Sequence, residues 1–202
     1  MFIKLQQIKV LLAYKNSGKL GDFAILKSDL LGAKVNPEVS FKLQQVVGYH
    51  PLIDLEKLSK YPQGTFGREY ADHMQKNHLQ AINVSAELEE VAQRNVFALR
   101  YAVTHDIFHV LLGFNTSYAG EIGVLAFAAE QNYSKSLKIA LWLAKIIYPI
   151  LAPQQIQAIF ANEKKGRELG KTVEFLLAYR FEEYWEVAIN EVRAKLGIRI
   201  NA

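Results

Sequence analysis

The chain has no cysteine among its 202 residues, which excludes disulfides and thiolate metal ligands. It also has no long hydrophobic run, because the longest apolar stretch, residues 137–151, contains Lys138 and Lys145 and is too short to span about 30 Å of hydrocarbon. The net charge is only +4, and the basic residues are scattered rather than clustered. A nucleic-acid partner is therefore not expected, whereas weak attraction to anionic lipid headgroups is compatible with this charge.

We expect neither a secretory signal nor a transit peptide at the N-terminus. Polar residues interrupt its first apolar stretch, residues 1–12, and no small-residue cleavage site follows. We therefore expect a cytoplasmic protein.

Helical patterns dominate the chain, and alternating strand patterns are nearly absent. Half of the residues are hydrophobic, so one sizeable core is expected without cross-links. The sequence predicts an all-α, single-domain helical bundle over residues 1–202. Predicted helices include residues 2–14, 22–28, 66–77, 122–129 and 137–151, a helix after an Asn36 cap, a short helix after Asp54, and two long helices, 85–112 and 164–196.

The helix of residues 137–151 can be interpreted in two ways. Because it is almost entirely apolar, we predict that it is buried in the core. The alternative is a surface that touches a membrane or a lipid chain, which its aromatic residues Trp142 and Tyr148 would also suit.

The most informative stretch runs from His105 to Glu121. On a helix, His105 and His109 lie one turn apart and Asp106 lies three positions from His109, so the three side chains converge. Gly113 predicts a helix end, after which the chain can turn back and bring Glu121 over the same patch. Imidazole and carboxylate ligands suit Zn²⁺, Fe²⁺ or Mn²⁺. The alternative is a hydrogen-bonded histidine patch in the core.

Three other enzyme classes fit less well. A zincin-type peptidase needs a glutamate where this chain has Asp106. HD-type phosphohydrolases carry a His-Asp pair and an upstream histidine, for which His73 or His78 could serve. They also need a downstream aspartate, and Asp106 is the last aspartate of the chain. Di-iron carboxylate proteins need paired Glu-x-x-His motifs, which do not occur here.

Three segments resemble one known family. HDIFHVLLGFNTSYAGE (residues 105–121) is similar to the His-Asp-x-x-His-x11-Glu signature of the coenzyme Q (ubiquinone) biosynthesis protein 4 family. YPQGTFGREYADHMQKN (61–77) and YRFEEYWEVAINEVRAKLGI (179–198) are similar to its Pro-x-Gly segment and its C-terminal helix. The expected absence of a transit peptide suits a bacterial-type member, although Tyr184 stands where the family typically has arginine.

The resemblance implies that His105, Asp106, His109 and Glu121 hold a divalent metal. Zn²⁺ is favoured, with Fe²⁺, Mn²⁺ or Mg²⁺ as alternatives. It further implies an all-helical protein, peripherally associated with a membrane surface, that binds a polyprenylated aromatic or isoprenoid lipid. Metal-dependent oxidative decarboxylation of the ring is one implied activity. A non-catalytic scaffold for other quinone-biosynthesis enzymes is the other, and a homodimer is compatible with both.

A lipid site would need residues for a polar head group and for an apolar tail. For the head group we predict contacts from Arg68, Tyr70 and Tyr101. For the tail we predict an apolar channel between the helices, lined by Phe97, Phe108, Leu125, Phe127, Leu141 and Leu177. Core packing is the alternative role for each of these side chains.

Overall fold

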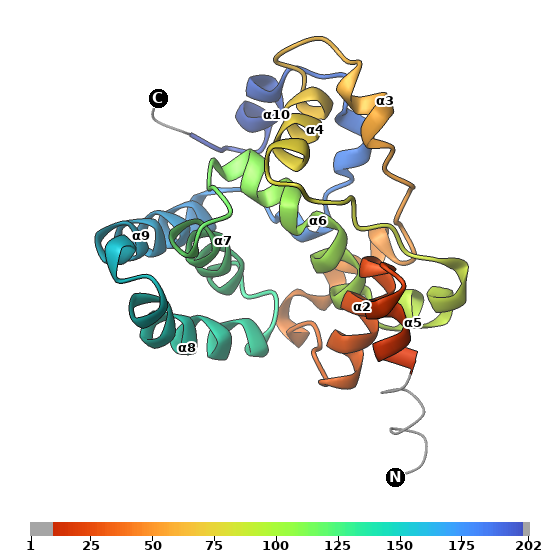
Figure 1. Ribbon diagram of the computed structural model, residues 1–202, viewed down its shortest axis with the longest axis horizontal. Helices are drawn as coiled ribbons and strands as arrows, with labels where there is room; N and C mark the ends of the chain where they lie inside the picture. Colours follow the sequence, from red (N-terminus) through yellow and green to blue (C-terminus); the bar gives the residue numbers. More distant parts are fainter. Residues whose placement is uncertain (1–9, 200–202) are drawn as a thin grey trace.

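A computed structural model describes residues 10–199 as a single all-α domain (Figure 1). Within these residues there is no β-sheet, and one isolated bridge joins Thr65 to Ala188. The predicted fold class is confirmed. Residues 10–16 are helical, and the rest of the helix predicted for residues 2–14 lies outside the described residues.

The elements follow one another along the chain with short connections. In order they are α2 (Leu20–Leu30), η1 (Pro37–Val46), α3 (Leu55–Ser59), α4 (Phe66–Lys76), η2 (Ala86–Leu88), α5 (Glu89–Arg94), α6 (Val96–Leu112), α7 (Tyr118–Glu130), α8 (Lys135–Leu151), η3 (Pro153–Gln155), α9 (Ile156–Thr172), η4 (Leu176–Ala178), η5 (Phe181–Tyr184) and α10 (Ile189–Lys195).

Helix α6 runs through the middle of the molecule (Figure 1). Helices α7, α8 and α9 lie together on one side of it, α3, α4 and α10 lie at one end, and α2 and α5 lie at the other. Twelve of the 17 residues of α6 are buried, which explains why its sequence is apolar on all sides. Helices α7 and α9 approach closely, because Gly166 leaves room for the carbonyl oxygen of Gly123.

The helix start predicted after Asp54 is confirmed, and the cap predicted at Asn36 is wrong. The side chains of Asp54, Thr65 and Ser134 accept backbone N–H groups at the starts of α3, α4 and α8. Asn36 does not cap the next element, which is a 3₁₀ helix. Its side-chain amide instead donates to the Asn132 side chain, so a distant contact replaces the local one.

The long helix predicted for residues 85–112 is wrong, because the chain breaks at Asn95 between α5 and α6. The Asn95 side-chain oxygen accepts the N–H of Ala98 and caps α6. Its amide nitrogen donates to an Asp29 carboxylate oxygen and to the Ala33 carbonyl oxygen. These contacts with α2 and the residues after it stabilise the non-helical backbone at the break.

The long helix predicted for residues 164–196 is also wrong. Helix α9 ends at Thr172, and 3₁₀ turns follow before α10. The buried side chain of Gln131 explains the interruption. Its amide nitrogen donates to the Val173 carbonyl, and its oxygen accepts the N–H of Leu176. These bonds keep the segment in a non-helical conformation.

The prediction that residues 137–151 form a buried helix is wrong as well. In α8 only Leu137, Leu141 and Ala144 are buried. The helix packs on α7 and α9 with one side, and its opposite side is exposed. No single described helix is long and apolar enough to cross a membrane. Helix α8 and the helical residues that follow it, 153–172, are long and apolar enough only when taken together, and the two parts are bent by 113° relative to each other.

Candidate metal centre

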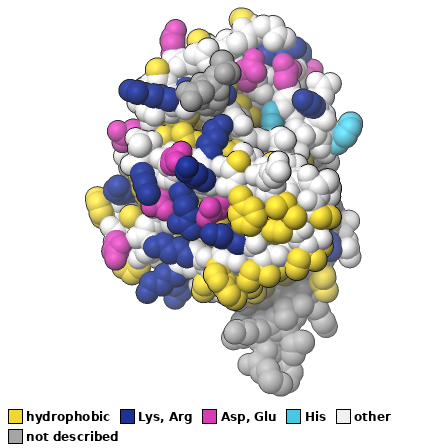
Figure 2. Space-filling view, turned by 90° about the vertical axis from the view of Figure 1, so that its left-hand side faces the viewer, with side chains coloured by type: hydrophobic (Ala, Val, Ile, Leu, Met, Phe, Trp, Pro, Cys, Tyr) yellow, Lys and Arg dark blue, Asp and Glu magenta, His cyan; other side chains and the backbone are white. Residues whose placement is uncertain are grey.

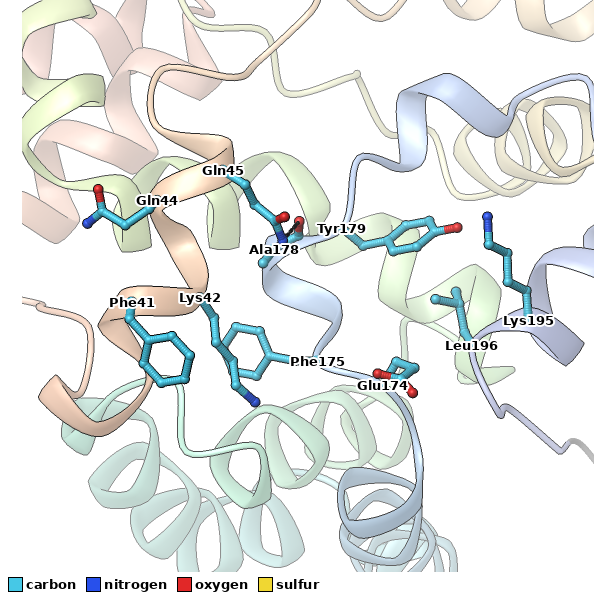
Figure 3. A pocket seen from close by; sticks show the side chains of 10 residues that line it. All are labelled: Phe41, Lys42, Gln44, Gln45, Glu174, Phe175, Ala178, Tyr179, Lys195 and Leu196. Atoms are coloured by element: carbon cyan, nitrogen blue, oxygen red, sulfur yellow. Dashed lines mark hydrogen bonds between the residues drawn. The ribbon is translucent and has the colours of Figure 1, made fainter.

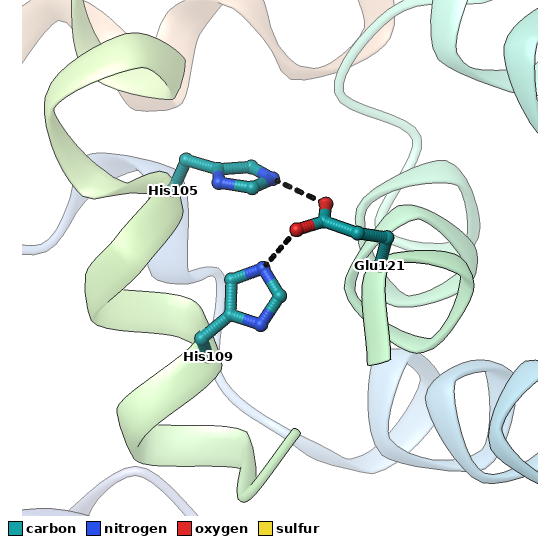
Figure 4. Close-up of side chains that lie close together, drawn as sticks. All are labelled: His105, His109 and Glu121. Atoms are coloured by element: carbon teal, nitrogen blue, oxygen red, sulfur yellow. Dashed lines mark ion pairs between the residues drawn. The ribbon is translucent and has the colours of Figure 1, made fainter. Parts of the chain in front are cut away.

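His105, His109 and Glu121 come together between α6 and α7 (Figure 4). The Nε2 atom of His105 lies 3.6 Å from one carboxylate oxygen of Glu121, and Nε2 of His109 lies 3.3 Å from the other. One ligand atom from each of the three residues lies within 4.8 Å of the other two. The structure therefore brings together three of the four predicted metal ligands in the way the spacing indicated.

The turn between α6 and α7 sets this arrangement. Gly113 ends α6 in the left-handed conformation, with φ of 70°, which a glycine adopts without steric cost. Ser117 then caps α7 by accepting the N–H of Gly120, and a side chain on Gly120 would collide with the Asn115 carbonyl. Glu121 consequently stands in the first turn of α7, facing the last turns of α6.

His109 is the most enclosed member of the group, since its side chain is fully buried. Its Nδ1 atom lies 3.3 Å from the carbonyl oxygen of Phe114. Its Nε2 atom has no hydrogen-bond partner among the described residues. If Nδ1 carries the proton and donates to the carbonyl, Nε2 presents a lone pair toward Glu121, which is the arrangement that a metal-binding imidazole needs.

Two imidazole nitrogens and one carboxylate fit a divalent metal. This donor set is typical of catalytic zinc sites, which keep a position open for water or substrate. A buried imidazole nitrogen without a partner is costly, and a bound cation would satisfy it. The residues present therefore fit the predicted metal.

Asp106, the fourth predicted ligand, lies on the other side of His105. Its carboxylate oxygen is 3.6 Å from Nδ1 of His105, the nitrogen that points away from Glu121. A carboxylate in this position can orient a metal-binding imidazole, and the direct ligand role of Asp106 stays a prediction. Burial alone lowers the pKa of His105, but the nearby carboxylates of Asp106 and Glu121 outweigh it, so that the pKa is raised.

His73 of α4 adds a third imidazole beside the group. Its ring stacks on that of His109, with 6.0 Å between the centroids, and its Nε2 is buried without a partner among the described residues. Burial, and then the proximity of His109, lowers the pKa of His73. Both histidines line a cavity of about 640 Å³. His78, the other upstream histidine considered, is exposed after the end of α4.

The predicted head-group residues lie in different environments. Arg68 bonds the Asp72 carboxylate and the Ser59 carbonyl, which ties α4 to α3. Tyr70 is buried, and this burial, more than the nearby Asp106 charge, raises the pKa of its hydroxyl. Tyr101 packs its ring edge against His105, 5.8 Å between centroids. Of the three, Tyr101 lies directly beside a predicted ligand.

Sequence reasoning missed two further tyrosines near Glu121. Tyr118 of α7 and Tyr148 of α8 lie with their rings 5.0 Å apart. Burial raises the pKa of Tyr148, and the Glu121 carboxylate raises it further. The sequence pattern gave no signal for the contact between these tyrosines, because it depends on how α8 packs on α7.

The side chains predicted to line an apolar channel lie in or against the hydrophobic core, and the channel stays a prediction. Phe108 and Phe127 meet edge to face with 5.9 Å between their centroids. Leu125 is partly buried against this core, and Phe97 also lines a cavity of about 710 Å³. The remaining two predicted residues, Leu141 and Leu177, are buried.

A separate cavity of about 610 Å³ lies between η1 and the C-terminal segment (Figure 3). Its lining combines aromatic and charged side chains, among them Phe41, Lys42, Glu174, Phe175, Tyr179 and Lys195. None of the predicted metal ligands lines it, so it is distinct from the metal centre.

Comparisons with known proteins agree with the motifs. The family described as coenzyme Q (ubiquinone) biosynthesis protein Coq4 matches residues 44–201. A human mitochondrial COQ4 homologue is 31% identical over 152 residues, 72% of this chain and 55% of that protein. A zebrafish homologue is 28% identical over 151 residues, 72% of this chain and 54% of that protein. The matched part of the chain thus corresponds to about half the length of these relatives.

The fold has also been seen in a crystal structure. A protein from Nostoc punctiforme, assigned to ubiquinone biosynthesis, superposes with a TM-score of 0.66 at 24% identity and covers 97% of this chain and 96% of its own. This likeness supports the helical fold. Because the family match extends over most of the chain and includes all the predicted metal ligands, the chain belongs to the Coq4 family.

Proposed function

We propose that this chain acts in ubiquinone biosynthesis by binding a prenylated aromatic precursor at a divalent metal held by His105, His109 and Glu121. The buried Nε2 atom of His109, aimed at the Glu121 carboxylate without a hydrogen bond, carries the metal part of this proposal. The names of the relatives support the biosynthetic role. Zn²⁺ suits the nitrogen and oxygen donors best, although Fe²⁺, Mn²⁺ and Mg²⁺ are also compatible.

A metal at this site would act as a Lewis acid toward a phenolic or carboxylate oxygen of the aromatic ring. The chain's own groups would position that ring. Asp106 fixes the orientation of His105 through Nδ1, and the Tyr101 hydroxyl, whose pKa burial raises, stays protonated and able to donate a hydrogen bond.

The surroundings of the centre differ on its two sides. The cavity shared by His73 and His109 has both polar and apolar walls, and its acidic residues Glu69 and Asp72 are accompanied by Lys76 and Arg193, which could pair with a ring carboxylate. Tyr101 packs against His105, and Tyr118 and Tyr148 join α7 to the apolar helix α8. We propose that the polar head enters the cavity and that the isoprenoid tail follows the apolar side chains between α6, α7 and α8.

Two versions of the function share this site. In the catalytic version, the protein assists oxidative decarboxylation of the ring, with an oxidant supplied from outside the chain. In the scaffold version, it holds the lipid and presents it to other quinone-biosynthesis enzymes without turnover.

Metal analysis and native mass spectrometry of protein purified without chelator would test the shared site. We expect about one divalent ion per chain, a bound prenyl lipid, and loss of the ion in Glu121→Gln. The matched control is Glu90→Gln, which removes an exposed carboxylate from the first turn of α5. A wild-type protein without metal, or equal metal in both variants, would contradict the proposal.

The two versions are then separated by incubating the metal-loaded protein with a prenylated hydroxybenzoate and an oxidant. Release of carbon dioxide that requires Glu121 supports the catalytic version. Stoichiometric binding of the same compound without release supports the scaffold version.

A further inference from the structure

Helix α8 presents a wide apolar surface to the outside of the molecule (Figure 2). Trp142 is 63% exposed and Ile150 is 74% exposed, although both are residue types that usually lie inside proteins. We call this surface the α8 face, and it consists of Ile139, Trp142, Leu143, Ile146, Ile147, Ile150 and Leu151. Ile156 and Phe160 extend it onto the first turns of α9. An apolar patch of this kind marks a site of interaction.

We infer that the α8 face docks onto an anionic lipid bilayer, with α8 lying in the plane of the membrane surface. This inference does not depend on the metal chemistry proposed above.

Charge is the first reason for choosing a bilayer. Helix α8 carries three lysines and no acidic residue, and α9 adds four basic residues against two glutamates. The whole chain is much closer to balance, with 24 basic and 20 acidic residues. In Figure 2 a group of lysines and arginines, with a few acidic side chains among them, lies beside the apolar patch. Anionic headgroups would meet this group while acyl chains cover the patch.

The placement of the charges within α8 is the second reason. Lys138 and Lys145 lie on one edge of the helix, between its buried side and its exposed apolar side, and Lys145 also pairs with Glu163 of α9 at 3.3 Å. A helix that lies in the interface needs this pattern, because its charged edge stays at the headgroups while its apolar face enters the acyl region. Trp142, on the exposed side, is a residue type enriched at that boundary.

A second copy of the chain is a less favourable occupant. A twofold contact uses the same surface on both subunits, so the basic residues beside the α8 face would meet at one interface. Helix α8 offers no acidic side chain to pair with them, and Glu163 of α9 is already paired with Lys145 and Arg167. Like charges at such an interface oppose association.

The docked helix would also lie next to the metal centre. Tyr148 projects from α8 toward α7, where it meets Tyr118 and lies in the electrostatic field of Glu121. The α8 face is on the outer side of the same helix. Docking would therefore place the metal centre one helix away from the bilayer, where a membrane lipid can reach it.

Sedimentation with vesicles tests this inference on the full chain. We expect binding to vesicles of equal parts phosphatidylcholine and phosphatidylglycerol, and little binding to phosphatidylcholine alone. The double variant Ile139→Ser/Ile146→Ser should lose affinity by about tenfold or more. Leu31→Ser/Leu52→Ser is the matched control, since it removes two exposed leucines outside the face and should bind like the wild type.

Charge reversal provides a second pair of variants. Lys135→Glu/Lys138→Glu should lower affinity for the anionic vesicles more than about 20-fold, since each lost lysine costs about fivefold near a charged membrane. Lys34→Glu/Lys57→Glu changes the net charge by the same amount at exposed positions elsewhere, and it should lower the affinity for vesicles less.

Trp142 gives a direct optical readout, because it belongs to the α8 face whereas Trp185 stacks on Phe66. Its emission should shift to the blue when anionic vesicles are added, and Trp142→Phe should abolish the shift. The inference is overturned if the wild type does not bind, if both double-serine variants bind equally, or if the wild type is a dimer that Ile139→Ser/Ile146→Ser converts to monomers. Glu121→Gln should bind vesicles like the wild type, which separates this test from that of the metal.

Discussion

The two nitrogens of the buried His109 ring lie close to Phe114 and to Glu121, which stand on either side of the turn between α6 and α7. Its Nδ1 lies 3.3 Å from the Phe114 carbonyl oxygen and its Nε2 lies 3.3 Å from a Glu121 carboxylate oxygen. The peptide carbonyl favours the tautomer whose other nitrogen is free to bind a metal. This one side chain therefore couples the folding of the turn to the formation of the site.

The first prediction concerns removal of this ring. His109→Gln should lower divalent-metal affinity by about 100-fold or more, because the site then loses one of three ligands. Titration with Zn²⁺ against a competing chelator measures the change. His78→Asn, which alters an exposed histidine, should leave the affinity unchanged. Equal affinity in all three proteins would contradict the assigned ligand set.

The second prediction separates two roles for Asp106. If the carboxylate orients His105 from its far nitrogen, Asp106→Asn should reduce metal affinity by only about 10- to 100-fold. If it is a direct ligand, as the sequence motif predicts, the loss should match that of Glu121→Gln. The same chelator titration distinguishes these outcomes.

The third prediction concerns pH. The folded protein lowers the pKa of His73 below 6.5, through burial first and the neighbouring His109 second. As the pH falls below 6.5, the unfolded chain binds a proton at His73 more readily than the folded chain does, so the free energy of unfolding decreases. His73→Gln should reduce this loss. Denaturant titrations of metal-free protein over this pH range measure it, and a His73→Gln profile identical to that of wild type would refute it.

The fourth prediction concerns a buried ion pair between α6 and η5. The Arg100 side chain is fully buried, and it donates to a Glu182 carboxylate that is 4% exposed and to the backbone carbonyls of Tyr49 and Tyr179. Arg100→Met should lower the free energy of unfolding by about 3–5 kcal/mol, since it leaves a buried carboxylate unpaired.

Two further variants control for this effect. Arg100→Met combined with Glu182→Leu should recover much of the stability, because no charge then stays buried without a partner. Arg94→Met breaks an exposed pair with Asp29 and should cost about 1 kcal/mol or less. Similar losses in Arg100→Met and Arg94→Met would argue against the buried-charge explanation.

The site was predictable where local geometry determines it. The four-residue spacing of His105 and His109 places both on one face of any α-helix, and Gly113 indicates where that helix ends. The short turn after Gly113 then brings Glu121 back over the same patch. His73 belongs to a different helix, so no local spacing predicts its contact with His109.

The fold was less predictable where distant residues decide it. The break at Asn95 depends on Asp29 and Ala33, and the end of α9 depends on Gln131. Neither set of partners is visible in the local pattern. For α8, an apolar sequence predicts burial, but the number of neighbours that pack on a helix is a property of the whole fold.

The short connection between α6 and α7 also affects the order in which the protein assembles. All three members of the metal group come from one helix–turn–helix segment, so closing the group costs little chain entropy compared with contacts between distant segments. The group can form before α4 and α10 have docked at the end of α6. A metal ion captured at that stage would stabilise the central hairpin and act as a folding nucleus for the helices that pack on it later.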